Sequence, residues 1–433
     1  MTSHALPAEP TVSAGLPPVV TRGKFIECHE CGLRQHLVAL AVGEKAKCPR
    51  CGATLRRGLT APLERAIALC FAGLALMAVA NFLPFITMSI EGRDQQADLV
   101  TGVLQLWALG DWPLALVVLL TTVAAPLFKL VSLLWVLLAL QLRRPPRYLP
   151  RLYRWVAKLH PWSMIEVYML GVFVAYVKLV DLATIAVGPA LFALAALMVL
   201  MVALSAVHDP EDVWEAMVAK RVSRARPARP GQAAILCEDC GLLAPAPHDG
   251  DGHHGHCPRC GAPLHHRKPE AMARAWALVI AAAILYIPAN LFPVMVVTSL
   301  GSSESDTIMS GVIYLATSGM LPIAILVFFA SITVPLLKLL GLVYLMIGTM
   351  RRSRLRLRDR ALMYRIIEAV GRWSMIDIFM VSILVALVRL GALASIAPGP
   401  GATAFAAVVV LTMFAAGAFD PRLMWDAAGE NDE

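Results

Sequence analysis

The sequence predicts a polytopic α-helical membrane protein made of two tandem parallel repeats, each a small four-cysteine zinc ribbon followed by about four transmembrane helices. Three observations lead to this prediction: an apolar composition, long uncharged runs, and a series of motifs that recurs along the chain. Of 433 residues, 58% are hydrophobic and only 16% are charged, and the mean hydropathy is +0.68. Soluble globular chains have about half apolar and about a quarter charged residues, so the composition argues against a soluble fold.

Several apolar runs are long enough to cross a bilayer, which takes about 20 helical residues. Four of these runs lie in each half of the chain, and they are too long and too apolar for the core helices of a small soluble domain. The predicted spans are Ala66–Ile90, Trp112–Leu142, Trp162–Val187, Pro189–Val207, Ala275–Leu300, Leu321–Met350, Trp373–Ile396 and Ala402–Phe419.

The motifs of the first half recur in the second half at a nearly constant offset in residue number. The cysteine pattern recurs 209 residues later, together with an Asn-x-x-Pro motif in the first span and a Pro-x-x-Lys motif in the second. After a two-residue insertion, Trp-Ser-Met-Ile-Glu at 162–166 returns as Trp-Ser-Met-Ile-Asp at 373–377. We infer a duplication. Because four spans per half is an even number, we expect parallel repeats about an axis along the membrane normal.

This recurrence also predicts the domain boundaries. A disordered N-terminal tail covers 1–22, since it is rich in Pro, Ala and Ser and lacks the apolar segment of a signal peptide. The first zinc ribbon covers 23–60 and is followed by a four-helix transmembrane domain over 61–222. The second ribbon covers 232–268, and its transmembrane domain covers 269–428.

The formal net charge of +8 invites a nucleic-acid function, but the positions of the basic residues favour a membrane topology. Basic residues cluster between the second and third spans of each half, whereas the alternate loops are nearly free of Lys and Arg. By the positive-inside rule, this bias places both termini and both cysteine clusters in the cytoplasm. We expect the spans to lie in a bacterial inner membrane. No nucleic-acid partner is expected. The clustered residues are Arg143, Arg144, Arg147, Arg151, Arg154 and Lys158 in the first half and Arg351, Arg352, Arg354, Arg356, Arg358, Arg360 and Arg365 in the second.

Eight of the nine cysteines form two C-x2-C-x16-C-x2-C sets, with glycine after every pair. Such spacing lets two tight turns present four thiolates to one tetrahedral ion, so we predict two structural Zn²⁺ ions. A rubredoxin-like iron site is the alternative, because Cys-Pro-x-Cys-Gly also suits iron. A closed four-thiolate site offers no open position for catalysis. The predicted ligands are Cys28, Cys31, Cys48, Cys51, Cys237, Cys240, Cys257 and Cys260, whereas Cys70 is expected to be a core residue.

Ionisable residues inside spans are costly to bury and are usually paired or functional. Two interpretations are open: the charges pair and hold helices together, or they line a polar path for a coupling ion or a lipid headgroup. Lys178 and Asp181 share one helix face and have no matching pair in the second half, so we favour the first half as the working site. The residues concerned are Lys129, Glu166, Lys178, Asp181, Lys338, Asp377 and Arg389.

Asparagine and proline also interrupt the predicted spans at matching places in the two halves. Proline inside a span frees a backbone carbonyl and kinks the helix, which would suit either a hinge or simple packing. These predicted helix-breaking residues are Asn81, Pro84, Pro126, Asn290, Pro293 and Pro335.

Taken together, the tandem ribbons and the three span motifs resemble the paraquat-inducible protein A family (PqiA, also LetA) from Cys28 to Trp425. The resemblance implies an inner-membrane protein that moves lipids between the inner and outer membranes with a periplasm-spanning MCE-domain protein of the PqiB or LetB type. We expect no enzymatic activity, and the chain has no G-x-x-x-x-G-K-[ST] loop for ATP.

A non-transporting membrane scaffold or stress-response protein is the alternative, with zinc ribbons that dock cytoplasmic partners. The transport and scaffold hypotheses differ in one structural expectation. Transport predicts a lipid-sized cavity bordered by Lys129, Glu166, Lys178 and Asp181.

Overall fold

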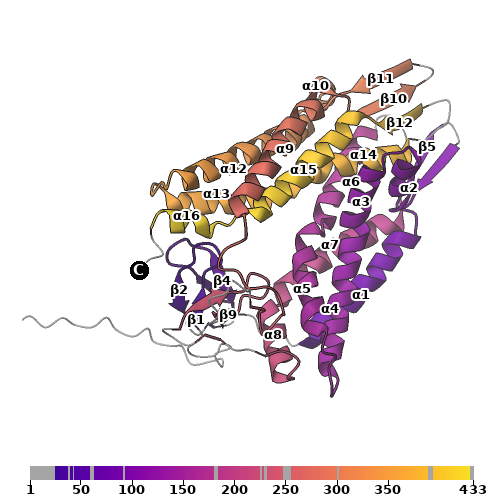
Figure 1. Ribbon diagram of the computed structural model, residues 1–433. Coiled ribbons are helices and arrows are strands. Elements are labelled where there is room, and N and C mark those ends of the chain that lie inside the picture. Colours follow the sequence, from indigo (N-terminus) through magenta and orange to yellow (C-terminus); the bar gives the residue numbers. More distant parts are fainter. Residues whose placement is uncertain are drawn as a thin grey trace, which may run out of the picture.

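The computed structural model describes residues 25–37, 40–41, 43–58, 63–90, 93–179, 184–224, 227–228, 232–246, 255–299, 302–388 and 394–429. Two helical bundles lie side by side, with small β-rich modules at one end and two three-stranded sheets at the other (Figure 1). We term these the ribbon end and the sheet end. The first half comprises residues 63–219 and the second half 271–427.

Each half passes four times between the ribbon end and the sheet end, so both halves begin at the same end and the repeats are parallel. The helices of the first half are α1 (Leu63–Phe82), α2 (Thr101–Ala108), α3 (Trp112–Leu119), η1 (Leu120–Ala124), α4 (Ala125–Gln141), α5 (Leu149–Leu159), η2 (His160–Trp162), α6 (Ile165–Leu179), α7 (Pro189–Val207) and α8 (Pro210–Ala219). Those of the second half are α9 (Ala271–Leu291), α10 (Ile308–Thr317), α11 (Leu321–Phe328), η3 (Phe329–Thr333), α12 (Val334–Met350), α13 (Leu357–Val370), η4 (Trp373–Met375), α14 (Ile376–Leu387), α15 (Pro400–Ala418) and α16 (Arg422–Ala427).

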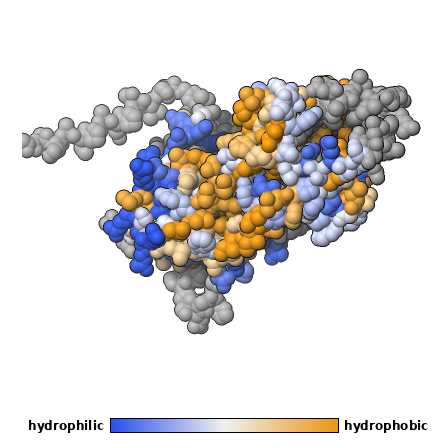
Figure 2. All heavy atoms as spheres, turned by 90° about the horizontal axis from the view of Figure 1, so that it is seen from above, coloured by the Kyte–Doolittle hydropathy of each residue, from blue (hydrophilic) through white to orange (hydrophobic). Residues whose placement is uncertain are grey.

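Seven helices within the described residues are long and apolar enough to cross a membrane. Large apolar side chains are exposed on many of them, and broad hydrophobic areas cover the face seen in Figure 2. Surface of this kind suits lipid rather than water. The predicted class, a multi-pass helical membrane protein with two repeats, is confirmed.

The third pass of each half is shorter than predicted. α6 has 15 residues and α14 has 12, which correspond to about 22 and about 18 Å at 1.5 Å per residue. The predicted spans Trp162–Val187 and Trp373–Ile396 overran these helices because their last residues form strands. Hydropathy alone cannot separate an apolar strand from the end of an apolar helix.

A three-stranded antiparallel sheet closes each half at the sheet end, and its middle strand directly follows the first helix. This strand takes up the last residues of the predicted spans Ala66–Ile90 and Ala275–Leu300. Pro84 and Pro293 lie two residues beyond the ends of α1 and α9, so they end these helices rather than kink them as predicted. The strands are β5 (Ile86–Ile90), β6 (Arg93–Ala97) and β7 (Thr184–Val187) in the first half, and β10 (Met295–Ser299), β11 (Ser302–Asp306) and β12 (Ala394–Pro398) in the second.

The second pass of each half contains a five-residue π-helical turn directly before α4 or α12. Pro126 and Pro335 follow these turns and cannot donate a backbone hydrogen bond, so nearby carbonyls need other partners. In the first half the carbonyl of Thr121 accepts the Met164 N–H at 3.3 Å. In the second half, Ile332 accepts the Tyr286 hydroxyl at 3.1 Å. The turn in the first half therefore ties the second pass to the Trp-Ser-Met motif that precedes α6.

The two halves meet where α6 packs on α14. Every residue of α14 is buried. The ring of Tyr168 meets that of Phe379 edge-on, with centroids 5.4 Å apart. Gly171 allows this close approach, because a Cβ there would lie 2.9 Å from the Cβ of Phe379.

The small modules at the ribbon end are the first ribbon (25–58) and the second ribbon (232–264). Each consists of two cysteine-bearing turns flanked by short antiparallel strands or, at His256 and Pro263, by a single bridge. Their strands are β1 (Phe25–Glu27), β2 (Arg34–His36), β3 (Lys45–Lys47) and β4 (Thr54–Arg57) in the first ribbon, and β8 (Ala234–Leu236) and β9 (Leu243–Pro245) in the second.

Replacing Gly171 with leucine should destabilise the contact between the halves. The new side chain would overlap Phe379, and overpacking of this kind costs about 1–3 kcal/mol. We expect the thermal unfolding midpoint of the detergent-solubilised protein to fall by several degrees. Gly417→Ala is the control, because nothing lies within 4 Å of its Cβ position. An unchanged midpoint for Gly171→Leu would contradict this packing.

Candidate metal centres and a chamber between the halves

The two four-cysteine clusters are assembled from four turns of the same backbone geometry. In every turn the carbonyl of the first cysteine accepts the N–H of the glycine that follows the pair, at 2.8 or 2.9 Å. Each of these glycines has a positive φ between 70° and 75°, a conformation that favours glycine over other residues. They are Gly32, Gly52, Gly241 and Gly261.

All eight predicted ligands are buried, and in each cluster the four sulfur atoms lie within 4.8 Å of one another. The Sγ atoms of Cys28 and Cys51 are 3.6 Å apart, and those of Cys31 and Cys48 are 3.5 Å apart. A Zn–S bond of about 2.3 Å separates the sulfurs of a tetrahedral site by about 3.8 Å. Both clusters therefore fit a metal ion such as zinc. Cys70, as expected, is buried in α1 away from them.

The first ribbon docks on the second half of the chain. The Nε of Arg365 in α13 lies 3.2 Å from the Glu30 carboxylate, and its guanidinium also donates to the Cys51 carbonyl at 2.6 Å. The guanidinium of Arg50 lies 4.6 Å from the ring centroid of Trp425 in α16. Glu30 and Arg50 each lie between two cysteines of a metal-binding pair, so the metal-binding turns are themselves the docking surface.

The second ribbon makes the matching contacts with the first half. Lys158 of α5 lies 3.2 Å from the carboxylate of Asp239, and Arg154 lies 3.7 Å from it. Arg259 lies 5.3 Å from the ring centroid of Trp214 in α8 and 2.9 Å from a carboxylate oxygen of Glu211. In the register of the duplication, these contacts correspond to those of Glu30 and Arg50. These docking contacts are thus crossed, because each joins a ribbon to the half that does not follow it directly in sequence. Each ribbon also has an ion pair with the half that does follow it, Arg56 with Asp209 in the first ribbon and Glu238 with Arg422 in the second.

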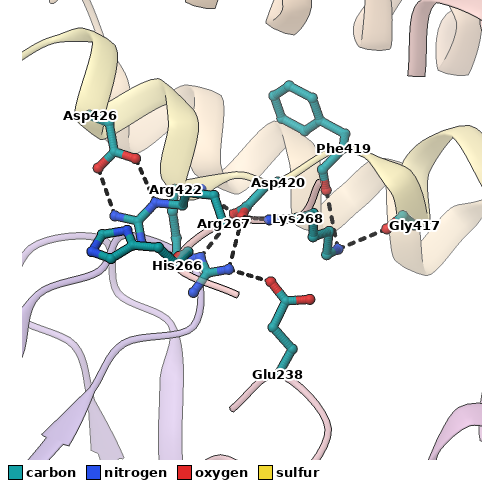
Figure 3. A network of polar contacts seen from close by, with 9 residues as sticks. All are labelled: Glu238, His266, Arg267, Lys268, Gly417, Phe419, Asp420, Arg422 and Asp426. Atoms are coloured by element: carbon teal, nitrogen blue, oxygen red, sulfur yellow. Dashed lines mark hydrogen bonds and ion pairs between the residues drawn. The ribbon is translucent and has the colours of Figure 1, made fainter. Parts of the chain in front are cut away.

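Further polar contacts connect the second ribbon and its C-terminal segment to α16 (Figure 3). Arg422 bonds to Asp420 at 2.8 Å and also contacts Glu238 of the second ribbon. Burial opposes ionisation of Asp420, but the hydrogen bonds and charge of Arg422 lower the pKa of that carboxyl below its usual value. Arg267 forms two bonds to Asp426, at 2.6 and 2.8 Å. The ribbons also touch each other, since Arg34 donates to the Ala234 carbonyl at 2.9 Å.

A chamber of about 1230 Å³ lies between the two ribbons and the ribbon ends of both halves. Typical small-molecule pockets occupy about 300–1,000 Å³. Its walls come from α4, α5, α7 and α8 of the first half, from both ribbons, and from α13 and the Asp420 segment of the second half. The two ribbons therefore border an open space that is larger than a small-molecule pocket.

The predicted intramembrane residues are separated in the structure. Lys129 is buried and borders the chamber, whereas Glu166 is exposed and does not. Lys338 and Asp377 are both buried in the second half. The side chain of Lys178 lies outside the described residues, and so do Asp181 and Arg389. Asn81 and Asn290 each bond back to the carbonyl four residues earlier, at 2.7 and 2.8 Å.

Several polar residues of the chamber were not predicted from the sequence. Tyr153 and His208 share a hydrogen bond of 2.8 Å, and His160 lies near them. Burial, followed by the charge of Lys129, lowers the pKa of both His160 and His208 to about 4. Both imidazoles are therefore neutral at pH 7. The signal that could have found them is their nearness in sequence to the recurring Trp-Ser-Met and Asp-Pro motifs.

A statistical model of paraquat-inducible protein A matches residues 63–218 and 272–429, once in each half. The intermembrane transport protein PqiA of Escherichia coli K12 is 35% identical over 418 residues, which cover 94% of this chain and 97% of the relative. The lipophilic envelope-spanning tunnel protein A of the same strain is 31% identical, covering 94% and 92%. A probable intermembrane transport protein of Haemophilus influenzae is 28% identical, covering 93% and 96%. No solved structure matches the chain.

We expect the purified chain to contain two metal ions, counted by inductively coupled plasma mass spectrometry. Cys48→Ser should reduce the count to one, since three thiolates hold the ion far more weakly than four. Cys70→Ala is the matched control, because it also removes a buried thiol but should retain both ions. A count of two for Cys48→Ser would exclude the first cluster as a metal site.

The crossed docking predicts that damage to one ribbon loosens the opposite half. Cys48→Ser should raise amide hydrogen exchange in α13, because that helix loses the charged contacts of Glu30 and the Cys51 carbonyl. Charged hydrogen bonds contribute about 1.5–3 kcal/mol each, so we expect about ten-fold faster exchange or more. Cys257→Ser, its counterpart in the second ribbon, should instead loosen α5. Uncrossed ribbons would give the opposite assignment.

Proposed function

The chain belongs to the paraquat-inducible protein A family, and from this premise we propose that it is the inner-membrane component of a system that moves lipids between the inner and outer membranes. Two relatives named for intermembrane transport or an envelope-spanning tunnel align over more than nine tenths of their length. Their names refer to transport, and we extend that activity to this chain.

The chamber at the ribbon end is the observation that supports the proposal best. Lipids are amphipathic, and the chamber offers both kinds of wall. Leu133 and Leu204 are apolar, whereas Lys129 brings a cation from within a membrane-spanning helix. Of the four residues that transport was expected to place around the cavity, Lys129 borders it, Glu166 does not, and the side chain of Lys178 and the whole of Asp181 lie outside the described residues.

We place the ribbons in the cytoplasm and the sheets in the periplasm. The arginine-rich loops before α5 and α13 lie at the ribbon end, and the positive-inside rule assigns such loops to the cytoplasm. The sheet end would then face a periplasm-spanning MCE-domain partner. In the reducing cytoplasm the clusters would hold Zn²⁺ rather than form disulfides. A colourless protein with two zinc ions would separate this from the iron alternative.

Lys338 and Asp377 are the described residues best suited to ion coupling. Lys338 is only 3% exposed, and its ammonium has no hydrogen-bond partner among the described residues. An ammonium in such a place inside a span is expensive unless it has a function. Lys178, Asp181 and Arg389 remain further candidates for the same path.

Removing either charge should abolish lipid delivery. We expect Lys338→Met and Asp377→Asn to reduce transfer of radiolabelled phospholipid to the MCE-domain partner, in cells, to the level seen without this protein. Lys220→Met is the control, because it removes the charge of an exposed lysine that directly follows α8. Unchanged transfer in both variants would refute ion coupling through these residues. The scaffold hypothesis would be favoured instead if the MCE-domain partner carried no lipid and cytoplasmic proteins remained bound to the ribbons.

A further inference from the structure

We propose that the first-half wall of the chamber binds a phosphate-bearing anionic group, with Lys129 as its cation and His160 and His208 beside it. The anion site follows from the geometry alone. The choice of a phospholipid headgroup, rather than free phosphate, as its occupant rests on the proposed function.

Lys129 is a buried cation that faces the chamber without an anionic partner of its own. Its side chain is 6% exposed, and it forms no hydrogen bond or ion pair with another described residue. Glu166 is the main acid acting on it, and that residue is exposed on α6 and does not line the chamber. A lysine so placed is a point charge available to a phosphate.

Among the described residues, all but one of the acids that line the chamber form ion pairs with cations, and the exception, Glu368, is exposed on α13. Asp239 lies 3.2 Å from Lys158, and Glu211 lies 2.9 Å from Arg259. Asp420 is paired with Arg422 in the same way. Because these acids are neutralised by their own cations, they do not balance the charge of Lys129, on which Glu166 acts from outside the chamber.

Two helices present matched pairs of polar and apolar side chains there. On α4, Lys129 and Leu133 are four residues apart and share one face. Leu204 lies on α7 and His208 directly follows that helix, where its N–H donates to the Leu204 carbonyl at 2.9 Å. The neutral imidazoles can donate hydrogen bonds to an anion, and the leucines can contact the apolar part of a lipid. An amphipathic phosphate ester fits this arrangement better than a purely apolar ligand.

The duplication supplies an internal comparison. Lys338 corresponds to Lys129, but Gly371 and Phe419 stand at the positions of His160 and His208. The ammonium of Lys338 lies over Gly371, 2.7 Å from where a Cβ would be, and this lysine does not line the chamber. The anion site is therefore built in the first half only.

Native mass spectrometry of the intact, detergent-solubilised chain tests the site. The probes are dihexanoyl phosphatidylglycerol, uncharged dihexanoylglycerol and inorganic phosphate. We expect one bound phosphatidylglycerol per chain, and Lys129→Met should weaken it about ten- to a hundred-fold, because a charged hydrogen bond is lost. Lys129→Arg should retain binding. His160→Gly, which copies the second half, should weaken binding while leaving Lys129 in place.

Lys220→Met controls for loss of a surface cation, and a retained count of two metal ions shows that each variant has folded. Equal phosphatidylglycerol binding by wild type and Lys129→Met would overturn the site, and so would equally tight binding of dihexanoylglycerol. Competition by inorganic phosphate at equal concentration would keep the site but assign it to free phosphate. Lys129-dependent binding without lipid delivery in cells would refute the proposed function and leave the anion site standing.

Discussion

The crossed docking of the ribbons is the constraint on which the ribbon end of the protein depends. Each ribbon places an arginine against a tryptophan of the opposite half, as Arg50 does with Trp425 and Arg259 with Trp214. Both arginines lie inside Cys-Pro-Arg-Cys turns, whose shape a bound metal ion would stabilise. Such an ion would act beyond its own ribbon, because it would fix a surface that joins the two halves. The chamber lies where the joined ribbons span the space between them.

Within the bundles, the membrane imposes a different constraint, because every backbone group in lipid must find a partner inside the protein. Pro126 and Pro335 break that rule locally, and a carbonyl of each preceding π turn accepts a hydrogen bond from another segment. Thr121 accepts the Met164 N–H from the segment before α6, and Ile332 accepts the Tyr286 hydroxyl of α9. The same kind of break therefore joins different helices in the two halves. It also positions Lys129 and Lys338, each three residues after its proline, on the inner side of the bundle.

Features that depend on the spacing of residues near one another in the sequence were predicted correctly. Contacts between segments that are distant in the sequence were not predicted. The cysteine pattern specified both clusters, and the hydropathy specified most spans, since each depends on neighbours along the chain. The strands β5 and β10 were missed because Ile86–Ile90 and Met295–Ser299 are as apolar as a helix end. The crossing was invisible for a different reason: a duplicated sequence has the same docking residues in both copies, so it cannot say which copy binds which. His160 and His208 were missed because the second half has Gly371 and Phe419 at their positions, so neither histidine belongs to a recurring motif.

Duplication also explains why the two halves need not do the same work. A shared scaffold keeps Lys129 and Lys338 at equivalent positions, but their surroundings have diverged. Lys129 faces the chamber with two imidazoles nearby, whereas Lys338 is enclosed against Gly371 and has no access to the chamber. A cation open to a large cavity suits a bound anion, and an enclosed cation in the same protein suits a charge that is gained or lost. Because α6 and α14 pack directly on each other, a change in the charge of one half can move the helix that lies against the other. The interface at Gly171 and Phe379 is a direct contact through which ion coupling in the second half would reach a lipid site in the first.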